Sequence, residues 1–211
     1  MRITKHGHAC VRLDRGEVSL VVDPGAFTHP GAVEGATAVL ITHEHADHWT
    51  PEMLRRTSGP VFTIEAVAAQ IREQAPEVAE RVTVVAPGES FDPGIPATAV
   101  GEKHAVIHPE LPHFDNSGYL FEDEGQRVFH PGDALTLPGT DVDVLLLPVS
   151  APWLKVSECI DYARDVGAAR SVAIHDAIYS DIGHQVVSGQ LERFLGERDQ
   201  QYVRLKDGQE L

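Results

Sequence analysis

The sequence predicts an α+β fold in which sheets pack together and helices lie outside them. Strand-like runs followed by helix-like runs occur twice along the 211 residues, a pattern typical of layered folds. The 18 glycines and 14 prolines are spread over the whole length, so we expect short elements joined by many turns. A chain of this size, with 42% hydrophobic residues, can bury a sizeable core. We therefore predict one domain over residues 1–211.

The first half is predicted to contain six strands and two helices. Asp14-Arg15-Gly16 has the composition of a hairpin turn between the second and third strands. Thr50 can cap a short helix that has Pro51 at its first position and ends near Gly59. A second helix is expected over Glu65–Gln74, where apolar residues recur near one face. The expected strands are Met1–Lys5, Ala9–Leu13, Ser19–Val22, Ala38–Thr42, Val61–Ile64 and Val82–Val85.

The second half repeats this order of strands and helices. We expect Ser157 to cap a helix that runs to Val166 and ends at Gly167. A last helix is predicted over Val186–Leu195. A hairpin is expected to turn at Asp123-Glu124-Gly125. The expected strands are Ala97–Val100, Gly118–Phe121, Arg127–Phe129, Asp143–Leu147, Ser171–Ile174 and Tyr202–Leu205.

The segment His43-Glu44-His45-Ala46-Asp47-His48 carries four ligand-type side chains directly after a buried apolar strand. Residues two apart in an extended segment point the same way, so His43 and His45 can bind one cation. Asp47 and His48 lie where the chain turns into a helix, and they can bind a second cation. Four such residues in six, at a strand-to-helix junction, favour a metal site over a surface turn.

One hexapeptide cannot complete two coordination spheres, so further ligands must come from elsewhere in the chain. Three candidates each lie near the end of a predicted strand, namely His104, Asp133 and His175. Asp133 follows His130-Pro131-Gly132, and its two carboxylate oxygens can neutralise two cations at once. Gly132 would let the backbone come close to the site.

These residues resemble the motif of the metallo-β-lactamase superfamily. In that motif, His-x-His-x-Asp-His is followed by a distant His, a bridging Asp and a final His. The match keeps the family order over essentially the whole chain, although Gly132-Asp133-Ala134 departs from the commoner Gly-Asp-Thr. Within the superfamily, the chain looks most like compact metal-dependent hydrolases related to L-ascorbate-6-phosphate lactonase. The resemblance implies a four-layer αββα sandwich, with the site at one edge between the two sheets.

The resemblance also assigns the ligands of two divalent metal ions. It implies that Asp23 braces the metal-binding loop from behind the ligands, and that Asp47 and Asp133 are the catalytic carboxylates. Zinc suits histidine and aspartate ligands and is the metal we expect, although manganese and iron suit them too. The implied ligands are His43, His45 and His104 for the first ion, and Asp47, His48 and His175 for the second, with Asp133 and a water or hydroxide between them.

Other side chains are candidates for the wall of the pocket. His108 and His113 compete with His104 as the third histidine, and His104 is preferred because an extended segment delivers it. The resemblance places the turn that carries His6 and His8 near the site. The candidate pocket residues, each of which can also be a packing or loop residue, are His108, His113, Trp153, Tyr179 and His184.

This ligand set predicts a metal-dependent hydrolase. Two metal ions about 3.5–4 Å apart lower the pKa of a bound water from 15.7 toward ~7, and the hydroxide attacks a carbonyl or phosphoryl centre. We expect a small polar substrate, namely a lactone, an ester or a phosphodiester. The alternative is a non-haem iron redox enzyme on the same scaffold, because the ligands tolerate iron. A metal-binding module without catalysis is disfavoured, because a structural metal usually takes about four ligands.

The composition narrows the partners and the compartment. The net charge is −15 and the basic residues are scattered, which disfavours nucleic acid and charged membrane surfaces as partners. No apolar stretch has the length of a membrane span or of a signal-peptide core. The two cysteines cannot build a disulfide scaffold, so we expect a cytoplasmic protein with a small-molecule substrate. A homo-oligomer is compatible with the resemblance, but no segment predicts an interface.

Overall fold

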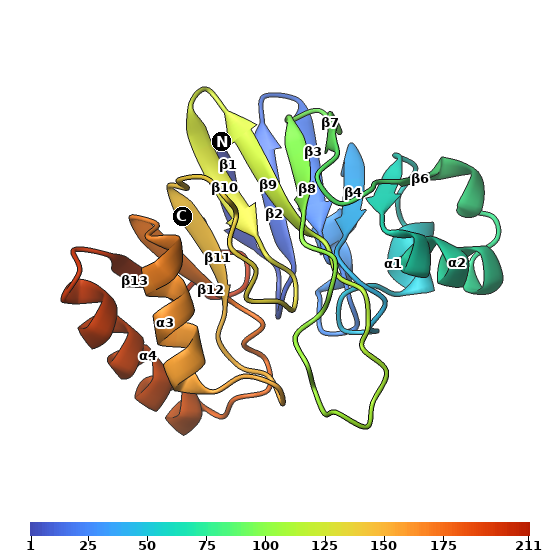
Figure 1. Ribbon diagram of the computed structural model, residues 1–211. Helices are drawn as coiled ribbons and strands as arrows, with labels where there is room; N and C mark the ends of the chain where they lie inside the picture. The colour runs from blue at the N-terminus through green and yellow to red at the C-terminus, as the bar shows by residue number, and fades with distance from the viewer.

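The computed structural model describes all residues from 1 to 211 and has four layers, with two sheets face to face and helices on their outer faces (Figure 1). This architecture confirms the predicted α+β sandwich. The first sheet has the strand order β1-β2-β3-β4-β5-β6. Its strands are β1 (Arg2–Lys5), β2 (Val11–Arg15), β3 (Val18–Val22), β4 (Ala38–Ile41), β5 (Val61–Thr63) and β6 (Val82–Val84).

The second sheet has the strand order β13-β12-β11-β10-β9-β8-β7. Its strands are β7 (Ser90–Phe91), β8 (Ala97–Val100), β9 (Gly118–Asp123), β10 (Gln126–His130), β11 (Val144–Pro148), β12 (Arg170–Ile174) and β13 (Gln201–Val203). None of the helices is both long and apolar enough to cross a bilayer. The α-helices are α1 (Pro51–Arg55), α2 (Glu65–Gln74), α3 (Val156–Val166) and α4 (Asp181–Gly196), and two short 3₁₀ helices cover Pro30–Val33 and Ala79–Arg81.

The central strands are buried on both faces because their side chains alternate between two cores. In β4, Ala38 and Leu40 pack between the sheets, whereas Val39 and Ile41 pack against α1 and α2. In β11, Val144 and Leu146 face the first sheet, while the residues between and after them pack beneath α3 and α4. Each large apolar side chain buried in this way contributes about 1.5–3 kcal/mol. The apolar runs in the sequence therefore fix which strands lie at the centre.

Strand direction brings several loops to the same edge of the sandwich. β3 is parallel to β4, and β10, β11 and β12 are parallel to one another. β1 and β8 share these directions, because one antiparallel strand separates each of them from β3 or β10. At this edge, which we call the near edge, two backbone hydrogen bonds join the sheets. Ser117 N–H donates to the Thr42 carbonyl (3.0 Å), and His175 N–H donates to the His8 carbonyl (2.9 Å).

At the opposite edge of the sandwich, the far edge, side chains form an ion pair between the two sheets. Arg15 at the end of β2 donates to the Asp123 carboxylate at the end of β9, over 3.1 Å. The Asp123 side chain is 4% exposed and that of Arg15 is 42% exposed. An ion pair with one partner this open to solvent contributes little, about 0–1 kcal/mol. The ion pair between Arg15 and Asp123 therefore adds little to the stability of the far edge.

The sequence predicted the N-terminal cap of the short helix α1 and the C-terminal end of α3, but not the N-terminal cap of α3. Thr50 caps α1 by accepting the Met53 N–H at 3.3 Å, and Gly167 ends α3 in a left-handed conformation, both as predicted. The prediction that Ser157 caps α3 is wrong, because the helix begins at Val156. The N–H of the preceding residue, Lys155, donates to the Glu158 carboxylate over 3.0 Å and takes the place of the expected hydroxyl cap.

Helix α4 begins five residues earlier than predicted, at Asp181 rather than Val186. The Ser180 hydroxyl caps it by accepting the Gly183 N–H at 3.3 Å. The first turns carry Ile182 and Val186 on the solvent side, where they are 73% and 59% exposed. These exposed apolar residues hide the helical period in the sequence. The short strand β7 and the two 3₁₀ helices were also not predicted.

Gly25 allows the loop after β3 to press against the loop after β4. A β-carbon on Gly25 would lie 1.9 Å from the carbonyl oxygen of Asp47. Both contacting groups belong to the backbone, so no side chain can rotate to relieve the overlap. The neighbouring Ala26 N–H donates to the Ala46 carbonyl at 2.8 Å and holds the two loops together.

Gly25→Ala is expected to lower the free energy of unfolding by about 2–3 kcal/mol, because the two loops must separate. Urea denaturation followed by far-ultraviolet circular dichroism measures this change. Gly189→Ala in α4 is the matched control, since nothing lies within 4 Å of its added β-carbon. A helical Gly→Ala exchange should stabilise by about 0.4–1 kcal/mol. Equal stability of the Gly25→Ala and wild-type proteins would contradict this account of the loop contact.

Candidate metal centre

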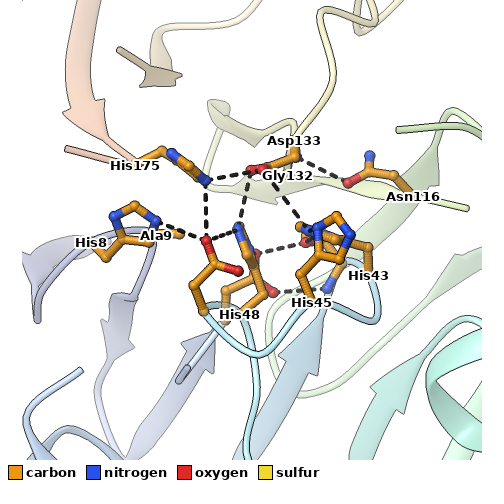
Figure 2. Close-up of polar contacts among 12 residues, drawn as sticks. His8, Ala9, His43, His45, His48, Asn116, Gly132, Asp133 and His175 are labelled. Carbon is orange, nitrogen blue, oxygen red and sulfur yellow. Dashed lines mark hydrogen bonds and ion pairs between the residues drawn. The ribbon is translucent and has the colours of Figure 1, made fainter. Parts of the chain in front are cut away.

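The structure brings all seven ligand candidates to the near edge, where they form two adjoining groups. Figure 2 shows five of them together, namely His43, His45, His48, Asp133 and His175. Within each group the potential ligand atoms all lie within 4.8 Å of one another. The first group comes from the loop after β4, the segment after β8 and the loop after β10. The second group also draws on the loops after β1 and β12. The first group is His43, His45, His104 and Asp133, and the second group is His8, Asp47, His48 and His175.

Asp133 lies between the two groups and faces both. Its Oδ2 is 3.4 Å from His104 Nε2 in the first group and 3.0 Å from His175 Nε2 in the second. Its Oδ1 is 3.1 Å from His48 Nε2. The side chain is only 4% exposed. One carboxylate is therefore placed to serve both groups.

The histidines direct one nitrogen inward because the other is fixed by a hydrogen bond on the outside. Nδ1–H donates to the Asp23 carboxylate in His48 (2.8 Å) and to the Ala105 carbonyl in His104 (2.6 Å). His175 Nδ1–H donates to the Ser150 carbonyl. In the neutral form of each ring, Nε2 therefore carries the lone pair, as in histidines that bind metals in proteins. His45 differs, because it turns Nδ1 toward His43 Nε2, at 3.1 Å.

Asp23 holds the 43–48 loop from below. Its carboxylate accepts the Thr42 N–H (2.8 Å), the Thr42 hydroxyl (2.7 Å) and His48 Nδ1–H (2.8 Å). The Thr42 oxygen lies 3.0 Å from His43 Nδ1, and because its own proton goes to Asp23 it accepts from that ring. Asp23 is fully buried and has a φ of +51°. Its three hydrogen bonds therefore orient one histidine of each group.

Asn116, which the sequence analysis missed, fixes the loop of Asp133. Its amide donates to the Pro131 carbonyl at 2.9 Å, and its oxygen accepts the Asp133 N–H at 3.0 Å. Gly132 has a φ of +63°, and a β-carbon there would lie 2.3 Å from the Asn116 oxygen. No sequence signal marks this asparagine, since it belongs to no motif. Gly132 was predicted to allow a close approach, and the structure shows which group approaches.

The arrangement of the ligand atoms fits divalent cations. His48 Nε2, His104 Nε2, His175 Nε2 and Asp133 Oδ1 are all buried and have no hydrogen-bond partner. A buried polar atom without a partner costs about 1–3 kcal/mol. In a tetrahedral site with zinc–nitrogen distances of ~2.0–2.1 Å, neighbouring ligand atoms lie ~3.3–3.4 Å apart. Four separations among these atoms and Asp133 Oδ2 or Asp47 Oδ2 are 3.0–3.5 Å and bracket that value. Two others are longer, at 3.9 Å from His48 Nε2 to Asp47 Oδ2 and 4.0 Å from His43 Nε2 to Asp133 Oδ2.

Without a cation, a proton on His175 provides the positive charge beside Asp133 and Asp47 in the second group. Burial opposes the charge of His175, but Asp133 and Asp47 raise its pKa to about 9. Burial likewise opposes the ionisation of Asp133, yet His48 and His175 hold its pKa well below the usual value. In the first group, burial and the charge of His48 hold the pKa of His43 well below the usual value. In the first group His43 and His45 are therefore neutral, whereas His175 of the second group binds a proton.

His8 joins the second group, although the sequence analysis placed only its turn near the site. Its Nε2 lies 3.1 Å from Asp47 Oδ2, and its Nδ1 accepts the Ala177 N–H at 3.2 Å. Burial lowers its pKa despite the hydrogen bond with Asp47, so the ring is neutral. Burial opposes ionisation of Asp47, but His175 and His8 hold its pKa below the usual value. The available sequence signal was the His6-Gly7-His8 turn between two strands.

The five candidate pocket residues lie at different distances from the centre. Trp153 lies closest, since its indole N–H donates to Asp133 Oδ2 at 3.2 Å and its ring packs edge-on against His104. His113 contacts only the backbone of the site, because its Nε2–H donates to the His104 carbonyl at 2.7 Å. His108 is exposed and accepts the Glu110 N–H at 3.2 Å, away from both groups. Neither replaces His104 among the ligand candidates.

Tyr179 and His184 lie beyond the second group. Their rings pack edge-on with centroids 5.8 Å apart. His184 lines a hollow of about 290 Å³ that also borders His8, Lys5 and Arg204. His184 therefore borders the hollow beside the centre, and Tyr179 packs against His184.

Comparison with known proteins agrees with this geometry. The chain matches the model of the beta-lactamase superfamily domain over residues 2–175. It is 39% identical over 198 residues to protein Rv0786c of Mycobacterium tuberculosis, which covers 90% of this chain and 91% of the relative. It is 23% identical over 193 residues to a UPF0173 metal-dependent hydrolase of Alkaliphilus metalliredigens, which covers 83% of this chain and 85% of the relative.

A solved structure shows the same fold. Igni18, a metallo hydrolase from the archaeon Ignicoccus hospitalis, superposes with a TM-score of 0.75 at 16% identity, covering 100% of this chain and 97% of that chain. The family match includes every one of the seven ligand candidates, the last of which is His175. The chain therefore belongs to the beta-lactamase superfamily.

Proposed function

We propose that this chain is a metal-dependent hydrolase that binds two divalent cations and activates a water between them. The observation that carries the proposal is the set of buried nitrogens and one carboxylate oxygen that face each other without hydrogen-bond partners. The similarity to a UPF0173 metal-dependent hydrolase supports it. The expected substrate is a small polar molecule with a carbonyl or phosphoryl centre, namely a lactone, an ester or a phosphodiester. A closer relation to L-ascorbate-6-phosphate lactonase stays a prediction.

The positions of the residues assign them to the two cations. The first group would hold one cation, and Asp47, His48 and His175 would hold the other, with Asp133 shared between them. Two such cations about 3.5–4 Å apart lower the pKa of a shared water toward ~7, which supplies hydroxide at neutral pH. Zinc suits these ligands, as do manganese and iron.

Asp47 and Trp153 have further roles in this proposal. The Asp47 side chain is 27% exposed, against 4% for Asp133. It therefore borders solvent and is the carboxylate that can orient the entering water or accept its proton. Trp153 donates to Asp133 Oδ2. This hydrogen bond orients the shared carboxylate, and the indole covers one side of it.

Metal content tests the proposal directly. Protein purified without chelators is expected to carry about two zinc or manganese ions per chain. His45→Ala and Asp133→Ala should lose bound metal and reduce turnover of lactones or phosphodiesters at least about 100-fold. Mass spectrometry of the metals and a substrate screen measure both effects.

His108→Ala is the matched control for the metal analysis. It removes an exposed histidine outside both groups, and we expect unchanged metal content and turnover. Retention of full turnover in the His45→Ala variant would overturn the proposal. Iron as the bound metal, together with oxygen consumption, would favour the redox alternative instead.

Zinc binding is expected to weaken as the pH falls. His175 has a pKa of about 9 in the metal-free protein, so it carries a proton at pH 7 that a cation must displace. The affinity should rise about tenfold per pH unit for each proton displaced, up to pH 9. Competition with a chromophoric chelator between pH 6.5 and 8.5 measures this slope.

The released protons can be counted independently. Zinc titration calorimetry in two buffers of different ionisation enthalpy gives the number of protons released per ion. The wild-type protein should release at least one proton, and His175→Gln should release fewer. An affinity that does not change with pH, with no proton release, would show that His175 is not a ligand.

A further inference from the structure

We propose that His8 is a positioning residue that orients Asp47 and His175 for the second cation and is not itself a ligand. This inference rests on the two-metal function proposed above. The distance criterion that groups His8 with Asp47, His48 and His175 does not distinguish a ligand from a hydrogen-bond donor. The hydrogen bonds of the His8 ring make that distinction.

The backbone fixes the tautomer of the His8 ring. The Ala177 N–H can only donate, and it lies 3.2 Å from His8 Nδ1. Nδ1 therefore carries a lone pair, and the proton of the neutral ring is on Nε2. Nε2 lies 3.1 Å from Asp47 Oδ2 and donates to it. A nitrogen that carries this proton has no lone pair for a cation.

Asp47 Oδ2 has room for both partners. It lies 3.5 Å from His175 Nε2 and 3.9 Å from His48 Nε2, on the side where a cation would lie. An ionised carboxylate oxygen has two lone pairs. The bond from His8 uses one of them, so the other is directed toward the two histidines.

The backbone of His8 holds the other ligand loop. Its carbonyl accepts the His175 N–H at 2.9 Å, and its ring packs against the His175 ring with centroids 4.0 Å apart. The next residue, Ala9, accepts His130 Nε2–H at 3.0 Å. Asp47 follows a strand of the first sheet and His175 follows a strand of the second. His8 therefore fixes two ligands that come from different sheets.

The conformation of His8 indicates that its side chain is required there. Its φ is +35°, a region that residues with a β-carbon rarely adopt, and its side chain is fully buried. Strain of this kind costs about 1–3 kcal/mol and persists where surrounding contacts enforce it. Asparagine, like histidine and aspartate, is enriched at positive φ among the residues other than glycine. This makes asparagine suitable as a test substitution.

Two variants separate the hydrogen bonds of the ring. His8→Asn places an oxygen where Nδ1 accepts the Ala177 N–H, but its side chain is too short to donate to Asp47. His8→Gln places an amide nitrogen near Nε2 and keeps the donor to Asp47. His6→Asn is the matched control, because His6 lies in the same turn and its side chain makes no hydrogen bond.

Titration with Zn²⁺ alone, against a chelator, measures the affinity of each binding step. We expect His8→Asn to weaken the second step about 10–100-fold and leave the first unchanged. His8→Gln and His6→Asn should stay within about threefold of wild type. Thermal denaturation of the metal-free forms shows whether each variant folds, and cobalt absorption spectra report the ligands of the second ion without any turnover assay.

Three outcomes decide between the proposals. Wild-type protein that binds no second zinc ion contradicts the two-metal function itself. Two zinc ions bound to His8→Asn with wild-type affinity contradict only the positioning role of His8. Equal loss of the second ion in folded His8→Asn and His8→Gln also overturns that role, because it shows that the ring itself is a ligand.

Discussion

The buried carboxylate of Asp23 is the contact on which the arrangement of the site depends. It accepts three hydrogen bonds, two from Thr42 and one from His48. Through Thr42 it also orients His43, so one carboxylate aligns a histidine of each group. A buried charge is costly unless it is fully hydrogen-bonded. The loop therefore has one low-energy position, in which its histidines face Asp133.

Backbone strain is concentrated where the ligands are held. Three of the five non-glycine residues with positive φ are His8, Asp23 and His175, and all three lie at the near edge. Each such residue costs about 1–3 kcal/mol. The double-sided packing of β4 and β11 offsets this cost, because those strands bury apolar residues on both faces. The fold is thus stabilised in its cores and carries strain at the site.

The sequence predicted best what depends on local pattern. The apolar run before His43 predicted a buried strand, and the spacing of the hexapeptide predicted which of its residues lie in the same group of ligand candidates. Asn116 and His8 could not be identified in this way, because their roles come from contacts with residues far away in the chain. The start of α4 was missed for a related reason, since exposed apolar side chains obscure its period. The sequence pattern therefore does not predict long-range contacts or the exposure of individual apolar side chains.

The ligand candidates come from both sheets, so a bound cation would also act as a cross-link. The loop after β4 belongs to the first sheet, while Asp133 and His175 follow strands of the second. At the far edge the strand ends are held by two ion pairs to Asp123, one from Arg15 and one from the N-terminal ammonium of Met1, and by a hydrogen bond from Arg15 to the Gly94 carbonyl. Separation of the two sheets would then begin at the far edge, and a bound metal ion would slow their separation at the near edge. Resistance to proteolysis would thus differ between the two ends of one molecule.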